Sequence, residues 1–426
     1  NRKNFSKYVS QNILGMIGFS CYVLADSYFI SIAKGADGLT ALNLVMPLYS
    51  IIFSIGEMIG VGSAIRYAIS KIKKDADADD YFWNAIIWCI MSSMIFVFAG
   101  IFFSSDIMRV LGADEHIVAV GNNYTKIFMC FAPMFMCNYV TNAFVRNDGA
   151  PGIAMSATLF SSLFNIVFDY ILMFPMNLGM EGAALATALS PIIGMGICSI
   201  HFFSKKSSVR LVVCKPSVRK LVAGSQLGVS AFVGEMSSAV ITLAFNFVIL
   251  KLTGNVGVAA YGVVANIAIV TTAVFNGVAQ GSQPLISSCF GRGDKDGCTQ
   301  LKRMGYTTAF VLAAVMYSIL FIFAEQFVAV FNSEGSEMLR LYATEGVKLY
   351  FIGIFFAGIN IVGGGAFSAT EDAFKAAVVS VARGFVLILG AVFVMSALFG
   401  MTGVWLAYAV AEGITTFIML VMALRV

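Results

Sequence analysis

The sequence predicts an all-α integral membrane protein in which twelve transmembrane helices form two parallel six-helix lobes around a central cavity. Three observations predict this fold: a shortage of charge, a series of long apolar stretches, and an internal repeat. Of the 426 residues, 59% are hydrophobic and only 12% are charged, and the mean hydropathy is +0.86. A soluble domain carries about 25% charged residues, so this chain lacks the charge to cover a water-facing surface.

The apolar stretches are long and numerous enough for twelve membrane crossings. A transmembrane helix needs about 20 predominantly apolar residues. The first stretch has no small-residue cleavage site after it, so we expect it to be retained as a span rather than removed as a signal peptide. We place the spans near residues 8–33, 39–69, 81–103, 119–145, 153–175, 182–203, 223–251, 257–290, 304–324, 345–369, 375–399 and 402–424.

Lysine and arginine are unevenly divided between the two sets of loops. If the N-terminus is cytoplasmic, nineteen of them, Arg146 included, fall on the inside and four on the outside. The positive-inside rule then predicts that both termini are cytoplasmic. The longest basic stretch, from Lys205 to Lys220, contains no acid and lies mid-chain. We therefore predict an N-terminal lobe over 1–203, a cytoplasmic linker over 204–222 and a C-terminal lobe over 223–426.

The two halves of the chain are related by an internal repeat. Shifting the sequence by 219 residues aligns turn glycines, a Gly-Ser pair and a loop Asp-x-Asp: Gly35 with Gly254, Gly38 with Gly257, Gly62-Ser63 with Gly281-Ser282, and Asp75-x-Asp77 with Asp294-x-Asp296. Six spans per half is an even number, so the halves are parallel and related by an axis along the membrane normal. This arrangement is typical of transporters with a cavity between two lobes.

Polar residues inside the spans break this symmetry, and the first half alone carries an oxygen-rich set. Asp26, Asn165, Asp169 and Thr187 correspond to Phe245, Ile388, Val392 and Tyr408 in the second half. At about 1.5 Å of rise per residue, the two aspartates and the threonine lie roughly 8–11 Å below the outer surface. Oxygen atoms from three helices at one level suit a proton-sharing carboxylate pair or Na⁺. The alternative is a hydrogen-bonded packing cluster between helices.

Two further acids, Glu57 and Glu235, also lie within apolar stretches. Each is a candidate for attracting a cationic substrate, and each could instead pair with a lysine or arginine or with a kinked backbone. The only histidines are His116 and His201, and the eight cysteines form no C-x-x-C motif, which leaves little material for a metal or nucleophile site. We expect no enzyme activity, no cofactor and no nucleic-acid partner.

Several longer motifs resemble the MATE (multidrug and toxic compound extrusion) family, and in particular its DinF-like branch. These are RNDGAPGIAMSATLFSSLFNIVFDYILMF with the following LGMEGAALATALS, GVAQGSQPLISSCFGRGDKDG, and FSATEDAFKAAVVSVARGFVLIL. The resemblance implies that Asp26, Asn165, Asp169 and Thr187 form the cation-coupling site, and that Tyr124 is a neighbouring member of the same site. The chain departs from the family in three places: the first span has no proline, the tenth has no Asp, and Glu371-Asp372 replaces small and basic residues.

The resemblance implies a cation-coupled antiporter, driven by H⁺ or Na⁺, that exports amphipathic and often cationic organic compounds by alternating access. It further implies a monomer in the lipid bilayer of the plasma membrane. The alternative within the same wider exporter group is a flippase for a lipid or a lipid-linked saccharide, which the acids disfavour because such a cavity must receive a phosphate. A major-facilitator transporter would carry Asp and Arg in the loop between its second and third spans, and KIKKDADADD lacks that pattern.

Overall fold

The computed structural model describes residues 2–332 and 335–424, with every side chain in these ranges except those of residues 31, 35, 36, 39, 40, 43 and 255. Within these ranges, every regular element is a helix. The first half contains α1 (Arg2–Ile72), α2 (Asp80–Val110), α3 (Glu115–Cys130), α4 (Ala132–Asn147), α5 (Pro151–Met173) and α6 (Met180–Phe202). The second half contains α7 (Val218–Thr253), α8 (Asn255–Gly291), α9 (Lys295–Ile322), α10 (Ala324–Phe331), α11 (Glu337–Tyr350), a 3₁₀ turn (Phe351–Gly353), α12 (Ile354–Ala369), α13 (Ala373–Val381), a π-helical turn (Ala382–Val386), α14 (Leu387–Phe399) and α15 (Met401–Leu424).

The helices confirm the predicted class of a multi-pass membrane protein. In the described part of the chain, eleven segments are long and apolar enough to cross a membrane, and α3 with α4, bent by 47°, makes a twelfth. The bend falls where Pro133 occupies the first turn of α4, because proline cannot donate the backbone hydrogen bond that would continue the helix. The sequence placed this span as one uninterrupted stretch over 119–145.

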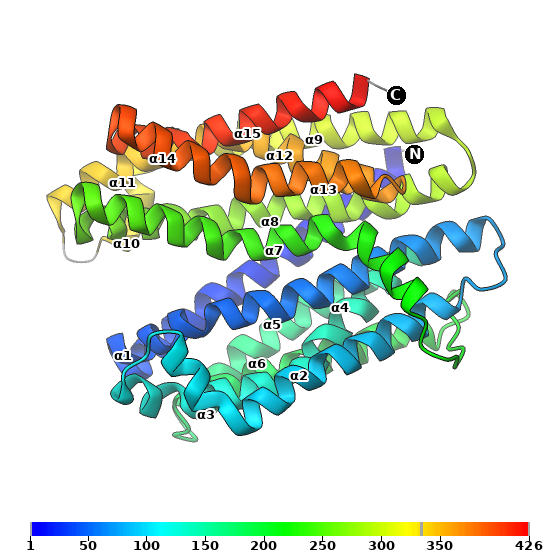
Figure 1. The fold of residues 1–426 in the computed structure, drawn as a ribbon, viewed down its shortest axis with the longest axis horizontal. Helices are drawn as coiled ribbons and strands as arrows, with labels where there is room; N and C mark the ends of the chain where they lie inside the picture. Colours follow the sequence, from blue (N-terminus) through cyan, green and yellow to red (C-terminus); the bar gives the residue numbers. More distant parts are fainter. Residues whose placement is uncertain (1, 333–334, 425–426) are drawn as a thin grey trace.

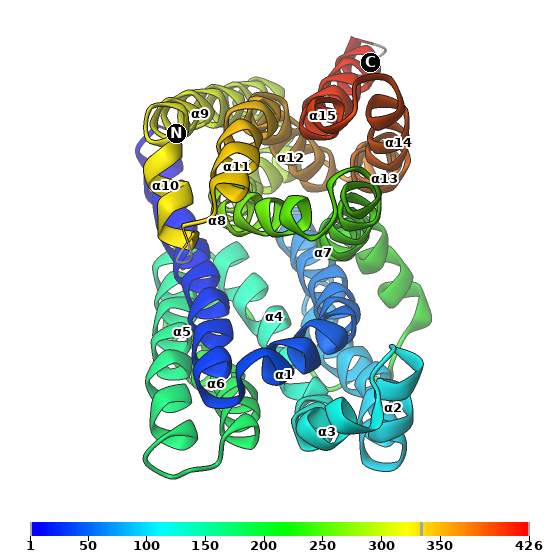
Figure 2. The ribbon, with the colours of Figure 1, turned by 90° about the vertical axis from the view of Figure 1, so that its left-hand side faces the viewer.

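The first two predicted spans belong to one continuous helical run, α1. Only its segments Arg2–Lys34 and Leu44–Ile72 qualify as membrane crossings, and Figure 2 shows the run turning back on itself between them. The turn lies where the sequence placed a loop, near Gly35 and Gly38. The chain therefore reverses direction so sharply that a side-chain carbon on Gly38 would lie 3.0 Å from the Ile30 side chain, eight residues earlier.

The helices form two groups, which lie one above the other in Figure 1. Each group has its own hydrophobic core, one built mainly from α1 to α6 and the other mainly from α7 to α15. Phe5 and Val9, at the start of α1, are exceptions because they are buried in the second core. Both termini lie at the right-hand end in Figure 1, together with loops 73–79, 203–217 and 292–294; we call this end the terminal face.

The lobes touch in the half of the molecule nearer the terminal face, through glycines. A side-chain carbon on Gly62 of α1 would overlap the Gly224 carbonyl of α7, and one on Gly228 would overlap the Met58 carbonyl. Glycine is therefore required at these positions because two helix backbones approach each other too closely for any side chain.

A second contact of the same kind joins α8 to the start of α1. A side-chain carbon on Gly277 would lie 2.5 Å from the Ile13 Cα, and one on Gly281 would lie 2.7 Å from the Val9 Cα. The 219-residue repeat relates this contact to the first one, since Gly62 corresponds to Gly281 and Val9 to Gly228. We call the two contacts together, through Gly62, Gly224, Gly228, Gly277 and Gly281, the glycine clasp.

Polar contacts on the terminal face also join the lobes. Arg66 of α1 donates from Nε to the Ala223 carbonyl at 2.9 Å, and its Nη1 lies 3.5 Å from the Glu371 carboxylate. Glu371 follows α12 with a φ of 60°, while Asp372 accepts the Lys375 backbone N–H at the start of α13. The acidic pair that departs from the family pattern thus makes one contact between the lobes and one helix cap.

The linker between the halves is held against α2. The indole N–H groups of Trp83 and Trp88 donate to the carbonyls of Cys214 and Ser217 at 2.9 and 3.2 Å. The Ser217 side chain in turn caps α7 by accepting from Lys220. Helix α7 therefore begins at Val218, inside the range predicted as linker.

Candidate functional site

The polar set predicted from the first half comes together in one buried cluster. Asp26 of α1, Tyr124 of α3, Asn165 and Asp169 of α5 and Thr187 of α6 are each less than a tenth exposed. Helix α5 begins with Pro151 in its first turn, a position that suits proline's fixed φ. Its buried residues recur every three to five positions, so that Asn165 and Asp169 share its inward face.

The two aspartates are close enough to share a proton. The Asp26 and Asp169 carboxyl groups lie within hydrogen-bonding reach of each other, which forms a bond when one of them is protonated. The Tyr124 hydroxyl bonds that of Tyr49 at 2.5 Å, and the Tyr22 side chain also lies near both acids. Sequence reasoning missed Tyr49 and Tyr22, since nothing distinguishes them from the many other aromatic residues of the spans.

The cluster contains buried oxygens that lack partners. Among the described residues, Asp26 Oδ1, Asn165 Oδ1, both carboxylate oxygens of Asp169, and Thr187 Oγ1 accept no hydrogen bond from the protein. Leaving such a group buried and unpaired costs about 1–3 kcal/mol. The set fits a bound proton or a small hard cation, which carboxylate, amide and hydroxyl oxygens coordinate.

A cavity of about 100 Å³ lies beside this cluster and is lined by both lobes. Asn165 and Thr187 of the cluster face it, as do Glu57 of α1 and Glu235 of α7. The structure thus brings all four residues to one cavity. Sites for drug-sized ligands usually measure about 300–1,000 Å³, so this conformation encloses far less space than such a molecule fills.

Arg146 lines the same cavity and belongs to helix α4, whereas the sequence counted it among the basic residues of the inside loops, beyond the end of the span. Helix α4 extends to Asn147, beyond the apolar stretch used to place the span, and Arg146 is only 4% exposed. Its Nη1 donates to Asn142 Oδ1 at 3.1 Å. Within the described residues its Nε has no hydrogen-bond partner.

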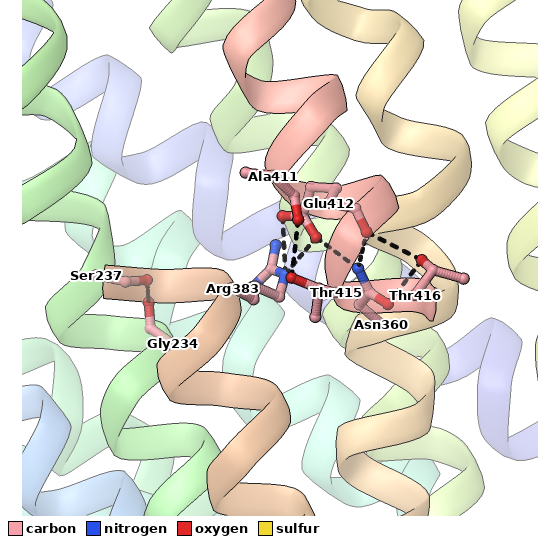
Figure 3. A network of polar contacts seen from close by, with 8 residues as sticks. All are labelled: Gly234, Ser237, Asn360, Arg383, Ala411, Glu412, Thr415 and Thr416. Carbon is pink, nitrogen blue, oxygen red and sulfur yellow. Dashed lines mark hydrogen bonds and ion pairs between the residues drawn. The ribbon is translucent and has the colours of Figure 1, made fainter. Parts of the chain in front are cut away.

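The second lobe has a buried polar network of its own, shown in Figure 3. Arg383, on the π-helical turn, donates from Nε to Glu412 of α15 at 2.9 Å. Asn360 of α12 donates to the same carboxylate at 2.7 Å and accepts from the Thr416 hydroxyl at 2.9 Å. Both charges are compensated here, in contrast to the first lobe. Glu412 could have been found from sequence as an acid within an apolar stretch, but its pairing with Arg383 could not.

Breaking this network should destabilise the second lobe. Glu412→Ala leaves the largely buried Arg383 guanidinium, whose side chain is 16% exposed, without its counter-charge, and losing the partner of a fully buried charge typically costs about 3–5 kcal/mol. We expect a lower thermal unfolding temperature in detergent than for the wild type. The double variant Arg383→Met/Glu412→Leu, which removes both charges, should recover most of the loss. An unfolding temperature unaffected by Glu412→Ala would contradict a stabilising role.

A two-lobed bundle of membrane-crossing helices, with acids gathered in a cavity between the lobes, defines the class of multi-pass membrane transporters. The sequence model of the MatE family matches residues 12–171 and 231–394. The chain belongs to this family of multidrug export transporters, whose members are not enzymes.

Similar proteins cover almost the whole chain. Multidrug export protein MepA of Staphylococcus aureus (strain MRSA252) is 27% identical over 414 residues, which is 94% of this chain and 89% of that protein. MepA of Staphylococcus saprophyticus is 26% identical over 410 residues, with the same shares covered. A solved transporter of the MOP superfamily from Pyrococcus furiosus is 20% identical, has a TM-score of 0.90, and matches over 99% of this chain and 95% of its own. A MATE crystal structure in the straight conformation is also 20% identical. It has a TM-score of 0.92 and likewise matches over 99% of this chain and 95% of its own. These structures confirm the predicted fold.

Proposed function

We propose that this chain is a cation-coupled antiporter that exports amphipathic, often cationic, organic compounds across the plasma membrane. The observation that carries the proposal is the group of unpaired buried oxygens around Asp26 and Asp169, next to a cavity lined by further acids. The names of the staphylococcal relatives, multidrug export proteins, support small organic substrates.

The terminal face is the cytoplasmic side in this proposal. The basic residues of loops 73–79, 203–217 and 292–294 lie there, as the positive-inside rule requires. The glycine clasp then closes the path to the cytoplasm, and the Asp26–Asp169 pair lies in the half of the membrane nearer the outside.

Coupling follows from differential affinity for two lobe arrangements. Loading the Asp26–Asp169 pair with H⁺ or Na⁺ from outside favours one arrangement, and binding of substrate favours the other, so each ligand shifts the population of the two. The membrane potential contributes about 2.3 kcal/mol per charge per 100 mV. Each net positive charge that moves inward per exported substrate molecule therefore sustains a substrate gradient of some tens-fold.

The coupling ion is either H⁺ or Na⁺, and the cluster has features that suit each. Two carboxyl groups within reach of each other can hold one proton between them, while five oxygens from three helices offer a ligand set for Na⁺. Efflux of a cationic dye from proteoliposomes under separately clamped pH and Na⁺ gradients separates the two. We expect efflux to require one gradient and to stop when that gradient is removed; equal rates without any gradient would contradict antiport.

The alternative function is a flippase for a lipid or lipid-linked saccharide. Such a protein should move a fluorescent phospholipid between leaflets in the same proteoliposomes without moving the dye. Glu57 and Glu235 in the cavity disfavour this function because they would repel a phosphate group.

A further inference from the structure

We infer that a groove between the two lobes binds an anionic phospholipid from the membrane leaflet next to the terminal face, and that the bound lipid stabilises the conformation in which this face is closed. The site is separate from the central cavity. The inference uses the proposed orientation, in which that leaflet is the inner one, and it does not depend on which compound is exported.

The groove measures about 600 Å³, whereas the central cavity measures about 100 Å³. It is formed by α2 of the first lobe and α7 of the second, with the second segment of α1 between them, as Figure 1 shows. Apolar side chains of all three helices line it, among them Ile55, Met58, Ile95, Phe96, Leu221 and Val229. Ile95 is 71% exposed, so the groove faces the bilayer. An acyl chain matches this wall, whereas an organic cation would find no counter-charge, because none of the described lining residues is charged.

Three polar side chains in the groove lack a partner. They are Ser92 of α2 and Ser225 and Gln226 of α7, and among the described residues none of them makes a side-chain hydrogen bond. The neighbouring Ser93, by contrast, donates to the Ile90 carbonyl at 2.7 Å, as helical serines commonly do. Two hydroxyls and one amide thus offer free donors. The ester oxygens of a phospholipid are acceptors only, so they suit this set.

The groove begins at the depth at which a phospholipid carries its esters. Trp88 of α2 donates to the Ser217 carbonyl just before α7, and tryptophan is enriched where the membrane meets water. Ser92 follows Trp88 by one helical turn, about 6 Å deeper along α2. The free donors therefore lie just below the headgroup level, and the apolar walls continue from there toward the centre of the bilayer.

A positive charge lies at the headgroup end of the groove. Arg219, Val222 and Gln226 are spaced i, i+3 and i+7 on α7, which places them on one face of the helix. Arg219 is exposed, and the acid that interacts with it, Asp77, is already paired with Lys220. Arginine binds phosphate groups well, and the inner leaflet carries the anionic lipids. The charge and the apolar walls together fit one anionic phospholipid.

The bound lipid would contact both lobes beside the glycine clasp. Met58 lines the groove, and its backbone carbonyl is the atom that approaches Gly228 in the clasp. Opening of the terminal face would move the α7 wall away from the walls that α1 and α2 provide. The lipid therefore binds the closed arrangement better than the open one and shifts the population toward it.

The binding test uses the tryptophans of the chain itself, which are Trp83, Trp88 and Trp405. Trp88 lies at the end of the groove, whereas Trp405 is fully buried in the second lobe. Phosphatidylglycerol with brominated acyl chains quenches indole fluorescence on contact. Titrated into the purified chain in an uncharged detergent, it should quench part of the emission saturably. Half-saturation should come at about fivefold lower concentration than with brominated phosphatidylcholine.

Four variants separate the contributions to binding. Arg219→Gln should raise the half-saturation concentration for phosphatidylglycerol about fivefold and leave that for phosphatidylcholine unchanged. Lys206→Gln, which removes an equal charge from an exposed linker position, is the matched control and should change neither. Gln226→Leu should weaken both lipids by about two- to tenfold, because both carry the ester oxygens. Ser92→Phe places a ring in the groove and should abolish the saturable quenching.

A distance measurement tests the effect on conformation. Spin labels at Asp75→Cys and Asp296→Cys, in a background without the native cysteines, report the separation of the lobes at the terminal face. Added phosphatidylglycerol should increase the share of the shorter distance, and Arg219→Gln should require more of this lipid for the same share.

Four outcomes would overturn the inference: quenching that rises without saturation in the wild type, equal effects of Arg219→Gln and Lys206→Gln, saturable quenching that survives Ser92→Phe, and a distance distribution that phosphatidylglycerol does not change. Dye efflux measured on the same protein tests the proposed function separately. Its failure would overturn antiport and leave the lipid site standing.

Discussion

Asp169→Asn should abolish ion-coupled efflux and leave the protein folded. The amide keeps the shape of the side chain but carries no titrating charge, and it can donate to the neighbouring Asp26 carboxylate as a protonated Asp169 would. Because it supplies a donor to a buried carboxylate, we expect an unfolding temperature equal to or above that of the wild type. Dye efflux from proteoliposomes and thermal unfolding in detergent measure the two effects.

The matching change on the other helix, Asp26→Asn, should behave in the same way. Asp75→Asn provides the control, since this acid is exposed on the loop after α1 and its replacement should leave efflux at the wild-type rate. Wild-type efflux by both cluster variants would contradict the role of Asp26 and Asp169 in cation coupling and would leave a packing role for the cluster.

Gly62→Ala should prevent the lobes from closing at the terminal face and should stop transport. The added methyl group would overlap the Gly224 carbonyl, and backbone atoms on two packed helices cannot rotate out of its way. We expect the lobes to separate there. Spin labels at Asp75→Cys and Asp296→Cys, both exposed on the terminal face, would report a longer distance in a background without the eight native cysteines.

Gly234→Ala serves as the matched control for this experiment. This glycine lies on α7, but a side-chain carbon added there meets no atom within 4 Å. The control should keep the wild-type distance and the wild-type transport rate. If Gly62→Ala also keeps both, the contact at Gly62 does not hold the lobes together.

The fold could be predicted almost completely from the sequence because the membrane imposes the length and polarity of each crossing. The details that the sequence did not predict are those set by the local backbone conformation. The chain reverses direction between the two spans of α1, Arg2–Lys34 and Leu44–Ile72, and the fourth span bends at Phe131 beside Pro133. Apolar composition continues through both places, so hydropathy does not register either feature.

The candidate cluster was predictable for a different reason. Asp26, Asn165, Asp169 and Thr187 are polar where the repeat offers apolar or aromatic counterparts, and a comparison of the halves exposes them. Arg146 was not predicted as a cavity residue because a helix can continue beyond its apolar stretch and place a charged side chain in the protein interior.

The network of Arg383, Glu412 and Asn360 escaped because its members come from three spans. A single sequence does not tell which of them face one another.

The glycine clasp has the geometry of an isologous interface. Val9 of the first half lies against Gly281 of the second, and the repeat-related pair, Gly228 and Gly62, takes part in the reciprocal contact on the other side of the axis. Reciprocal contacts of this kind define the interface of a two-fold symmetric dimer. Each half therefore presents a self-complementary edge. Two copies of one half, or the two halves made as separate polypeptides, could therefore form the same close glycine contacts that the two lobes form within one chain.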